Sequence, residues 1–291
     1  MDIKKHPFPF LLMMLLSLTV QAKEAEIIVW DRLANNPVIY RVLQMALDKT
    51  RAEYGPYHLT LSRPMEQGRV MLELAKNQKV NLANFAPTSE RETKLLPIRI
   101  PVTKGLLGYR VCLIKEGTQS QFDGIHSLQD WKKRGLRVGQ DTHWPDTAIL
   151  EGNGLKVVKS VKYKPLFKML VKGRFDCFSR SVSEVLPELE KHRAEGIELD
   201  NKFALVYRLP TFFFVSRQNP QLAKRLQKGL KAIQVDGSFD SFITATYAPQ
   251  FKSLGMKQRQ PIYLDNPYLS EATQKIVKNP TLWLNPFAKS H

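Results

Sequence analysis

The sequence predicts an α/β protein with two βαβ-type lobes, each built on a mixed sheet, joined by a two-segment hinge. One observation behind this prediction is that strand-like apolar runs alternate with segments whose apolar residues recur at helical spacing. A second is that the alternation stops at Pro97 and Pro101 and then begins again. Alternating strands and helices are typical of parallel or mixed sheets covered by helices, so two blocks indicate two sheets facing a cleft.

The first block starts with an expected strand and a capped helix. Its strands are expected at residues 26–30, 57–61 and 80–85. Asn36 and Pro37 mark the start of its first helix, because Asn caps helix N-termini and Pro fits the first turn. That helix has an apolar face that should point to the core, formed by Ile39, Val42, Leu43, Ala46 and Leu47. A second helix is expected over residues 67–76.

The second block repeats the pattern before the chain returns to the first lobe. Its strands are expected at residues 106–115, 136–140, 157–161 and 175–179, and its helices at Ser127, Pro145, Pro165 and Ser183. The return consists of extended runs at 204–207 and 212–216, then a long helix capped by Asn219. Residues from about 262 onward are rich in Pro and Asn, and we expect them to be irregular.

These elements give a division of the chain. We expect a signal peptide at 1–22, the first part of lobe one at 23–103, lobe two at 104–203, the return part of lobe one at 204–262, and a C-terminal tail at 263–291. The crossings near 102–106 and 202–206 are expected to form the hinge.

The N-terminus has the pattern of a secretory signal peptide. Lys4 and Lys5 precede an almost wholly apolar run, and small residues at Val20 and Ala22 suit cleavage after Ala22. The alternative is a retained membrane anchor, but the run of about 13 residues is shorter than the roughly 20 that a span requires. We therefore expect the mature protein in the periplasm.

The composition favours an anionic small-molecule partner over nucleic acid. The formal net charge is +17, which attracts anions. However, the lysines are scattered along the chain, as on solvated faces, and no nucleic-acid motif accompanies them. Nothing in the sequence indicates a stable oligomer, so a monomer is expected.

Chemical motifs are few. Cys112 and Cys177 both lie in strand-like runs, so either a disulfide between neighbouring strands or two buried thiols is expected. No zinc-type ligand cluster, nucleophile motif or phosphate-binding loop is present, and we predict no cofactor, metal or catalysis. His143 beside Asp141 or Asp146 is the only candidate base, and a structural or ligand-contacting role suits it better.

Three loops after predicted strands are candidate ligand sites. They contain Trp30 with Arg32; the segment 84–91, ending in Arg91; and the segment 140–147. A Trp can stack on a ligand and an Arg can grip an anion at two points. The alternatives are a Trp packed under its loop and arginines that are solvated or paired with nearby glutamates.

The chain resembles the extracellular solute-binding proteins of family 3, the amino-acid-type periplasmic binding proteins of the type II fold. Four segments carry the resemblance in the family's order: TSERETKLLPIRIP (88–101), SLQDWKKRGLRVGQ (127–140), LFKMLVKGRFDCF (166–178) and NPQLAKRLQKGLKAIQVDGSF (219–239). The resemblance covers nearly all of the mature chain and implies a two-lobed fold that closes over its ligand.

The resemblance also implies roles for particular residues. Arg91 matches the family arginine that binds the ligand's α-carboxylate, and Asn84 and Thr88 fall where polar contacts are expected. The loop that supplies donors from lobe two contains Thr142, His143 and Trp144.

One position departs from the family. Asp176 matches the Asp of the family's GriDa motif and is expected to be structural. Five residues later the family has an Asp that pairs with the ligand's ammonium, but here the residue is Ser181, with Arg180 beside it. We therefore expect Arg180 to contact the ligand, and a ligand that either carries more negative charge than a standard amino acid or lacks its ammonium group.

Taken together, the sequence predicts a periplasmic protein that captures a small polar, anionic or amino-acid-like ligand for an ABC importer. Two alternatives stay open. One is a sensory protein that signals through a membrane receptor, and the other is a dehydratase-like enzyme on the same fold.

Overall fold

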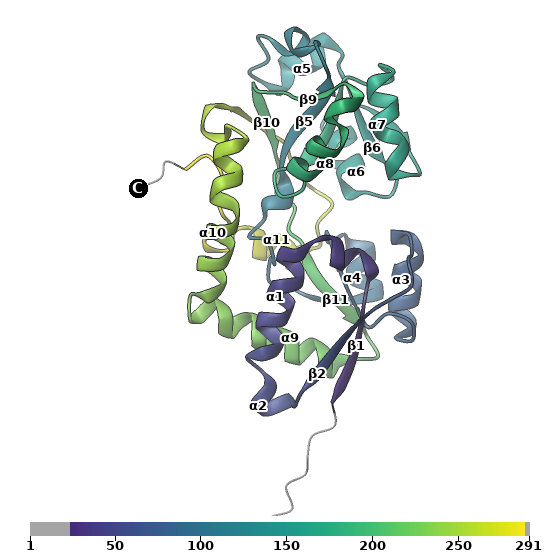
Figure 1. Cartoon of the computed structure of the whole chain (residues 1–291), viewed down its shortest axis with the longest axis vertical. Helices are drawn as coiled ribbons and strands as arrows, with labels where there is room; N and C mark the ends of the chain where they lie inside the picture. The colour runs from purple at the N-terminus through teal and green to yellow at the C-terminus, as the bar shows by residue number, and fades with distance from the viewer. Residues whose placement is uncertain (1–23, 289–291) are drawn as a thin grey trace, which may run out of the picture.

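The structure is a computed structural model and describes residues 24–288. The elements gather around two sheets, which form two lobes along the long axis of the molecule (Figure 1). The expected signal peptide lies outside the described residues. Within residues 24–288, no helix combines the length and apolar character that a bilayer span requires.

The lobe-one sheet has the strand order β2-β1-β3-β11-β4. Its strands are β1 (Ala25–Val29), β2 (Tyr57–Leu61), β3 (Leu82–Phe85), β4 (Leu95–Ile98) and β11 (Phe212–Ser216). Strand β1 is parallel to β2 and β3, whereas β11 is antiparallel to β3 and β4. The sheet is therefore mixed, as the sequence predicted.

Helices cover the lobe-one sheet. They are α1 (Pro37–Asp48), α2 (Arg51–Tyr54), α3 (Gln67–Lys76), α4 (Ser89–Lys94), α9 (Pro220–Val235) and α10 (Ser238–Ser253). The Asn36 side chain accepts a hydrogen bond from the N–H of Ile39, which confirms the predicted helix start. Helices α1 and α9 pack very closely, because a methyl group added at Gly229 would lie 2.0 Å from the carbonyl oxygen of Ala46.

The lobe-two sheet has the order β12-β10-β5-β8-β6-β7, with β9 also paired to β5. Its strands are β5 (Tyr109–Lys115), β6 (Arg137–Asp141), β7 (Lys156–Ser160), β8 (Cys177–Ser181), β9 (Ile197–Leu199), β10 (Phe203–Val206) and β12 (Gln260–Tyr263). Its helices are α5 (Leu128–Arg134), α6 (Pro145–Gly152), α7 (Tyr163–Val171) and α8 (Val185–His192). A disulfide between Cys112 and Cys177 joins the antiparallel neighbours β5 and β8, with a Cα–Cα distance of 5.1 Å.

Two strands lie in a different sheet from the one expected. The segment 204–262 was assigned to lobe one, but β10 and β12, at its two ends, belong to the lobe-two sheet. The reason is backbone pairing: β10 is antiparallel to β5 and parallel to β12. Phe203 and Leu205 of β10 are buried in the apolar cluster of lobe two. The second crossing between the sheets therefore lies at 207–211.

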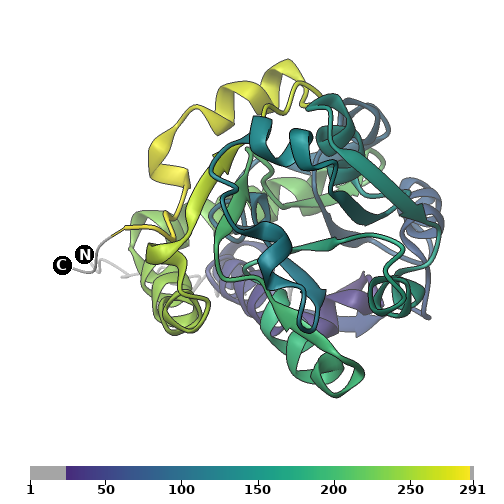
Figure 2. The ribbon, with the colours of Figure 1, turned by 90° about the horizontal axis from the view of Figure 1, so that it is seen from above.

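The C-terminal segment is more ordered than expected. It contains α11 (Glu271–Val277) and the short 3-10 helix η6 (Pro280–Leu282), and it runs along the outer edge of the molecule (Figure 2). Asn153 of lobe two pairs with Asp265, and the hydroxyls of Ser270 and Thr273 both donate to Glu92 of lobe one. The chain thus crosses between the lobes both before and after β12, outside the two predicted hinge segments.

Candidate functional site

A pocket of about 130 Å³ lies between the two lobes. Lobe one contributes Arg32 after β1 and the start of α3, while lobe two contributes the loop after β6 and Val161 after β7. The lining residues are Arg32, Glu66, Gln67, Gly68, Arg69, Asp141, His143, Trp144 and Val161. These segments follow the carboxyl ends of strands, where ligands bind in open α/β sheets.

Arg91 links the lobes directly. The hydroxyl of Thr88 caps α4 by accepting the Arg91 N–H at 3.2 Å, which fixes the start of this helix. The Arg91 guanidinium donates to the carbonyl of Ala86 at 2.6 Å and, across the cleft, to that of His143 at 3.3 Å. It also lies 5.3 Å from the ring of Phe85.

The charge of Arg91 is buried without an ion-pair partner. The residue is 5% exposed, and within residues 24–288 no carboxylate lies within ion-pair distance of it. Burial lowers the pKa of Arg91 to about 10, against an opposing effect of the Asp146 charge. The side chain therefore stays cationic at neutral pH and is hydrogen-bonded to neutral carbonyls.

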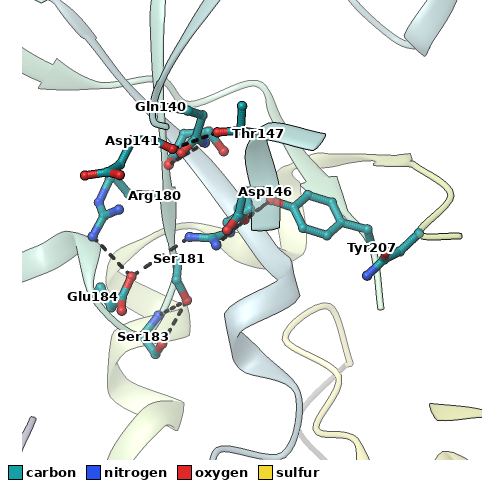
Figure 3. Close-up of polar contacts among 12 residues, drawn as sticks. Gln140, Asp141, Asp146, Thr147, Arg180, Ser181, Ser183, Glu184 and Tyr207 are labelled. Atoms are coloured by element: carbon teal, nitrogen blue, oxygen red, sulfur yellow. Dashed lines mark hydrogen bonds and ion pairs between the residues drawn. The ribbon is translucent and has the colours of Figure 1, made fainter. Parts of the chain in front are cut away.

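A buried network supports the lobe-two side of the cleft (Figure 3). Asp146, in the first turn of α6, pairs with Arg110 of β5 and accepts a hydrogen bond from the Tyr207 hydroxyl. The Arg110 Nε donates to the same hydroxyl at 3.1 Å. Burial alone would lower the pKa of Arg110, but the charge of Asp146 raises it above its ordinary value. The network anchors the end of the loop that carries His143.

Arg180 is neutralised by carboxylates of the next helix. Its guanidinium makes two hydrogen bonds of 2.6 Å to Glu188 and one of 3.2 Å to Glu184. The ring of Trp144 lies 4.7 Å from it. The structure therefore brings Arg180 under Trp144 as a support of the pocket wall, and its charge is already shared with two carboxylates.

Ser181 ties lobe two to the first crossing. Its hydroxyl donates to the Leu106 carbonyl at 3.0 Å and lies 2.8 Å from that of Ser183. The nearby Glu184 lies 3.9 Å from Arg110, and burial raises its pKa while Arg180 and Arg110 oppose the rise. Glu184 therefore contacts both Arg180 and Arg110, and Figure 3 shows its carboxylate beside Arg180.

The other predicted residues divide into two groups. Arg32, His143 and Trp144 line the pocket, and Arg32 pairs with Glu66. Trp30 is buried, donates its Nε1–H to the Met65 carbonyl and packs on Phe85, so it lies under its loop.

Trp30, Asn84, Thr88, Arg91, Thr142 and Arg180 do not line the pocket, and Arg91 touches its wall through the bond to the carbonyl of the lining residue His143. Asn84 lies within β3 opposite Phe213, and Thr88 serves as the cap of α4. Thr142 is exposed, and its N–H donates to the Ser160 carbonyl at 2.9 Å. Asn84, Thr88 and Thr142 therefore have structural roles in β3, at the start of α4 and in the loop after β6.

Sequence reasoning missed three contributors. They are the start of α3 with Arg69, and Val161, both of which line the pocket, and Glu184, which lies near Arg110 and Arg180. A signal existed for each of them, because each lies at or after the end of a predicted strand, whereas Asp141 belongs to the predicted segment 140–147. Within the described residues, no group of three His, Cys, Asp or Glu side chains is placed to hold a metal ion.

Comparisons with known proteins identify the fold. No family model matches the sequence, and no curated protein sequence is significantly similar. An ancestral arginine-binding protein bound to arginine is 19% identical, with a TM-score of 0.55 over 77% of this chain and 98% of that one. A binding component of an ABC transporter from Wolinella succinogenes, complexed with lysine, is 14% identical, with a TM-score of 0.55 over 77% and 96% of the two chains.

A third similar structure is a histidine kinase sensor domain described as similar to periplasmic binding proteins. It is 13% identical, with a TM-score of 0.54 over 78% of this chain and 96% of that one. At these identities the similarity establishes the fold alone, and it agrees with the resemblance seen in the sequence. The chain therefore has the α/β fold of the type II periplasmic binding proteins.

Proposed function

We propose that the protein is a periplasmic solute-binding protein that captures a small polar, anionic or amino-acid-like ligand between its lobes. The observation that carries this proposal is the state of Arg91. It is a buried cation at the lobe boundary, and its partners are two backbone carbonyls, one from each lobe. A ligand carboxylate would form a stronger, charge-assisted pair with the same guanidinium.

Ligand binding then becomes an exchange of partners. A carboxylate that enters the cleft replaces the His143 carbonyl on Arg91 and cancels the buried charge. Arg69 pairs with Glu73 and Arg32 with Glu66, so those arginines are already neutralised. Arg91 is thus the cation of the cleft that gains most from an anion, since a buried charge without a counter-ion is costly.

The opposite wall suits a positive group. Asp141 lines the pocket, is 8% exposed, and its Oδ1 accepts the His143 N–H at 2.8 Å. In this orientation the ligand carboxylate faces lobe one and an ammonium group faces lobe two. Asp141 would pair with the ligand ammonium. Ser181 does not, because its side chain is uncharged and its hydroxyl donates to the Leu106 carbonyl. An amino-acid-like ligand therefore fits the cleft despite the substitution at position 181.

Closure of the lobes would trap the ligand. Once the ligand carboxylate has replaced the His143 carbonyl on Arg91, the ligand itself would join the two lobes, with its carboxylate on Arg91 and its other end on the loop after β6. Exclusion of water strengthens each charge-assisted contact. We propose that the closed form delivers its ligand to the permease of an ABC importer, with a membrane sensor as the alternative partner, and that the protein is a monomer without catalytic activity.

A thermal-shift screen with matched variants tests the proposal. The panel contains the amino acids, dicarboxylates and phosphorylated metabolites, tested on the wild type and on Arg91→Ala and Arg91→Lys. A ligand present at about 100 times its Kd should add about 2.7 kcal/mol of stability to the wild type. We expect Arg91→Ala to lose this stabilisation and Arg91→Lys to keep part of it.

The matched control is Arg51→Ala, which removes an exposed arginine that pairs with Asp48 outside the cleft. It should respond to the ligand like the wild type. A hit that stabilises Arg91→Ala as much as the wild type would remove Arg91 from the binding site. Calorimetric titration of the same variants gives the change in Kd directly.

A further inference from the structure

A second pocket, larger than the cleft pocket, lies on the outer side of the lobe crossings. Its volume is about 320 Å³, compared with about 130 Å³ for the pocket between the lobes. Ligand sites typically measure roughly 300–1,000 Å³. Its lining residues are Tyr109, Val206, Tyr207, Arg208, Tyr263, Leu264, Pro280, Trp283, Asn285 and Phe287. None of them lines the cleft pocket, so the two pockets are distinct.

One wall of this outer pocket is built by three adjacent strands. Val206 of β10 pairs with Tyr109 of β5 on one side and with Tyr263 of β12 on the other. Directly paired residues present their side chains to the same face of a sheet. The two tyrosines therefore flank Val206 in a single row, and Tyr263 is 70% exposed. This row depends on β10 and β12 lying in the lobe-two sheet.

The C-terminal segment builds the opposite wall. The Leu284 N–H donates to the Lys104 carbonyl at 2.9 Å, which fixes the segment against the first crossing. The ring of Phe287 lies 5.9 Å from that of Tyr109. Trp283 packs directly on the backbone of the crossing, because a methyl group added at Gly105 would lie 1.6 Å from its ring.

The charge of the outer pocket comes from one arginine. Arg208 is exposed, and its guanidinium lies 4.7 Å from the Trp283 ring. No acidic residue lines the pocket, and within residues 24–288 no carboxylate lies within ion-pair distance of Arg208. Arg208 itself lines the pocket together with Tyr109, so its charge faces the same space as the aromatic rings.

We propose that the outer pocket is a second ligand site, which binds a planar aromatic anion. The aromatic rings would enclose the flat face of the ligand, and Arg208 would pair with its carboxylate. Tyr207 connects the site to the cleft, since it lines the outer pocket while its hydroxyl donates to Asp146 in the buried network. The site is independent of the ligand proposed for the cleft.

Isothermal titration with three indole compounds tests the site. The compounds share one ring system and differ in charge: indole-3-acetate is an anion, indole is neutral and tryptamine is a cation. We expect indole-3-acetate to bind saturably with a Kd below about 1 mM, indole more weakly and tryptamine most weakly. Arg208→Gln should weaken indole-3-acetate about tenfold and leave indole unchanged.

Two further variants locate the binding. Tyr263→Ala, which removes a side chain that is 70% exposed, should weaken binding of both indole-3-acetate and indole. Arg91→Ala should leave them unchanged, because it alters the cleft alone. The proposal is overturned if no saturable binding occurs below about 10 mM, if the three compounds bind equally, or if Arg91→Ala abolishes binding while Arg208→Gln does not. The last result would place the compound in the cleft.

Discussion

Removal of the Asp146 carboxylate should strongly destabilise the protein. Asp146 is 3% exposed and Arg110 is 2% exposed, so the variant Asp146→Ala leaves a buried guanidinium whose remaining counter-charge is the more distant Glu184, at 3.9 Å. Breaking a buried pair in this way costs about 3–5 kcal/mol. For a protein of this size, each kcal/mol corresponds to a fall in Tm of about 2–4 °C, which predicts a fall of about 6–20 °C.

Two comparison variants separate the pair from other effects. Urea unfolding and thermal melts are measured on Asp146→Ala, on the double variant Arg110→Met/Asp146→Leu, and on Glu53→Ala. The double variant should recover part of the loss, because apolar side chains of similar volume replace a buried pair at little cost, while the buried Tyr207 hydroxyl loses both of its partners at a cost of about 1–3 kcal/mol. Glu53→Ala breaks an exposed pair with Lys228 and should cost at most about 1 kcal/mol. The reasoning is refuted if Asp146→Ala stays within about 1 kcal/mol of the wild type.

Three further predictions follow from single features. Because burial lowers the pKa of Arg91 to about 10, the affinity for an anionic cleft ligand should be constant above neutral pH and fall once the pH exceeds about 10. If Arg91 instead kept its ordinary pKa of 12.5, the affinity would stay constant through this range. Binding titrations at several pH values distinguish the two results. Cys112 and Cys177 are 65 residues apart, so the double variant Cys112→Ala/Cys177→Ala should lose about 4 kcal/mol in urea unfolding, and a loss below about 1 kcal/mol would contradict this. Glu92→Ala should speed amide hydrogen exchange in α11 but not in α9, because it removes the hydrogen bonds to Ser270 and Thr273. An α11 exchange rate equal to that of the wild type would show that Glu92 does not stabilise this helix.

The parts of the fold that depend on local chemistry were predictable. Asn36, Ser127 and Asn219 each cap the helix that follows them, because the capping bond joins residues two or three positions apart. Helix α7 begins at Tyr163, ahead of the expected start at Pro165. Such boundary shifts come from neighbouring tertiary contacts, which the local pattern does not record.

The parts that depend on distant pairing were not predictable. Strand β10 reads as a buried extended run, and nothing in its residues specifies β5 and β12 as its neighbours. The start of α11 is likewise hydrogen-bonded to Glu92, which lies far away in the sequence.

The candidate site shows the same division. Motif position singled out Arg91, but its bond to the His143 carbonyl joins residues 52 positions apart. Arg180 was expected to face a ligand because its sequence neighbour Ser181 lacks a charge. The structure pairs it with Glu188, eight residues later on α8. Proximity in sequence was therefore a poor guide to which cation is free to bind.

The most direct test of the account is whether a ligand changes the separation of the two lobes. The native cysteines form a disulfide, so cysteines introduced at Leu72 of α3 and Lys164 of α7, both exposed, take up spin labels selectively. Pulsed electron paramagnetic resonance then reports the distance between lobes with and without a hit from the screen. We predict that the ligand narrows the distribution and shifts it to shorter distances, and that Arg91→Ala removes this change. An identical distribution at saturating ligand would contradict a clamp that closes on its solute.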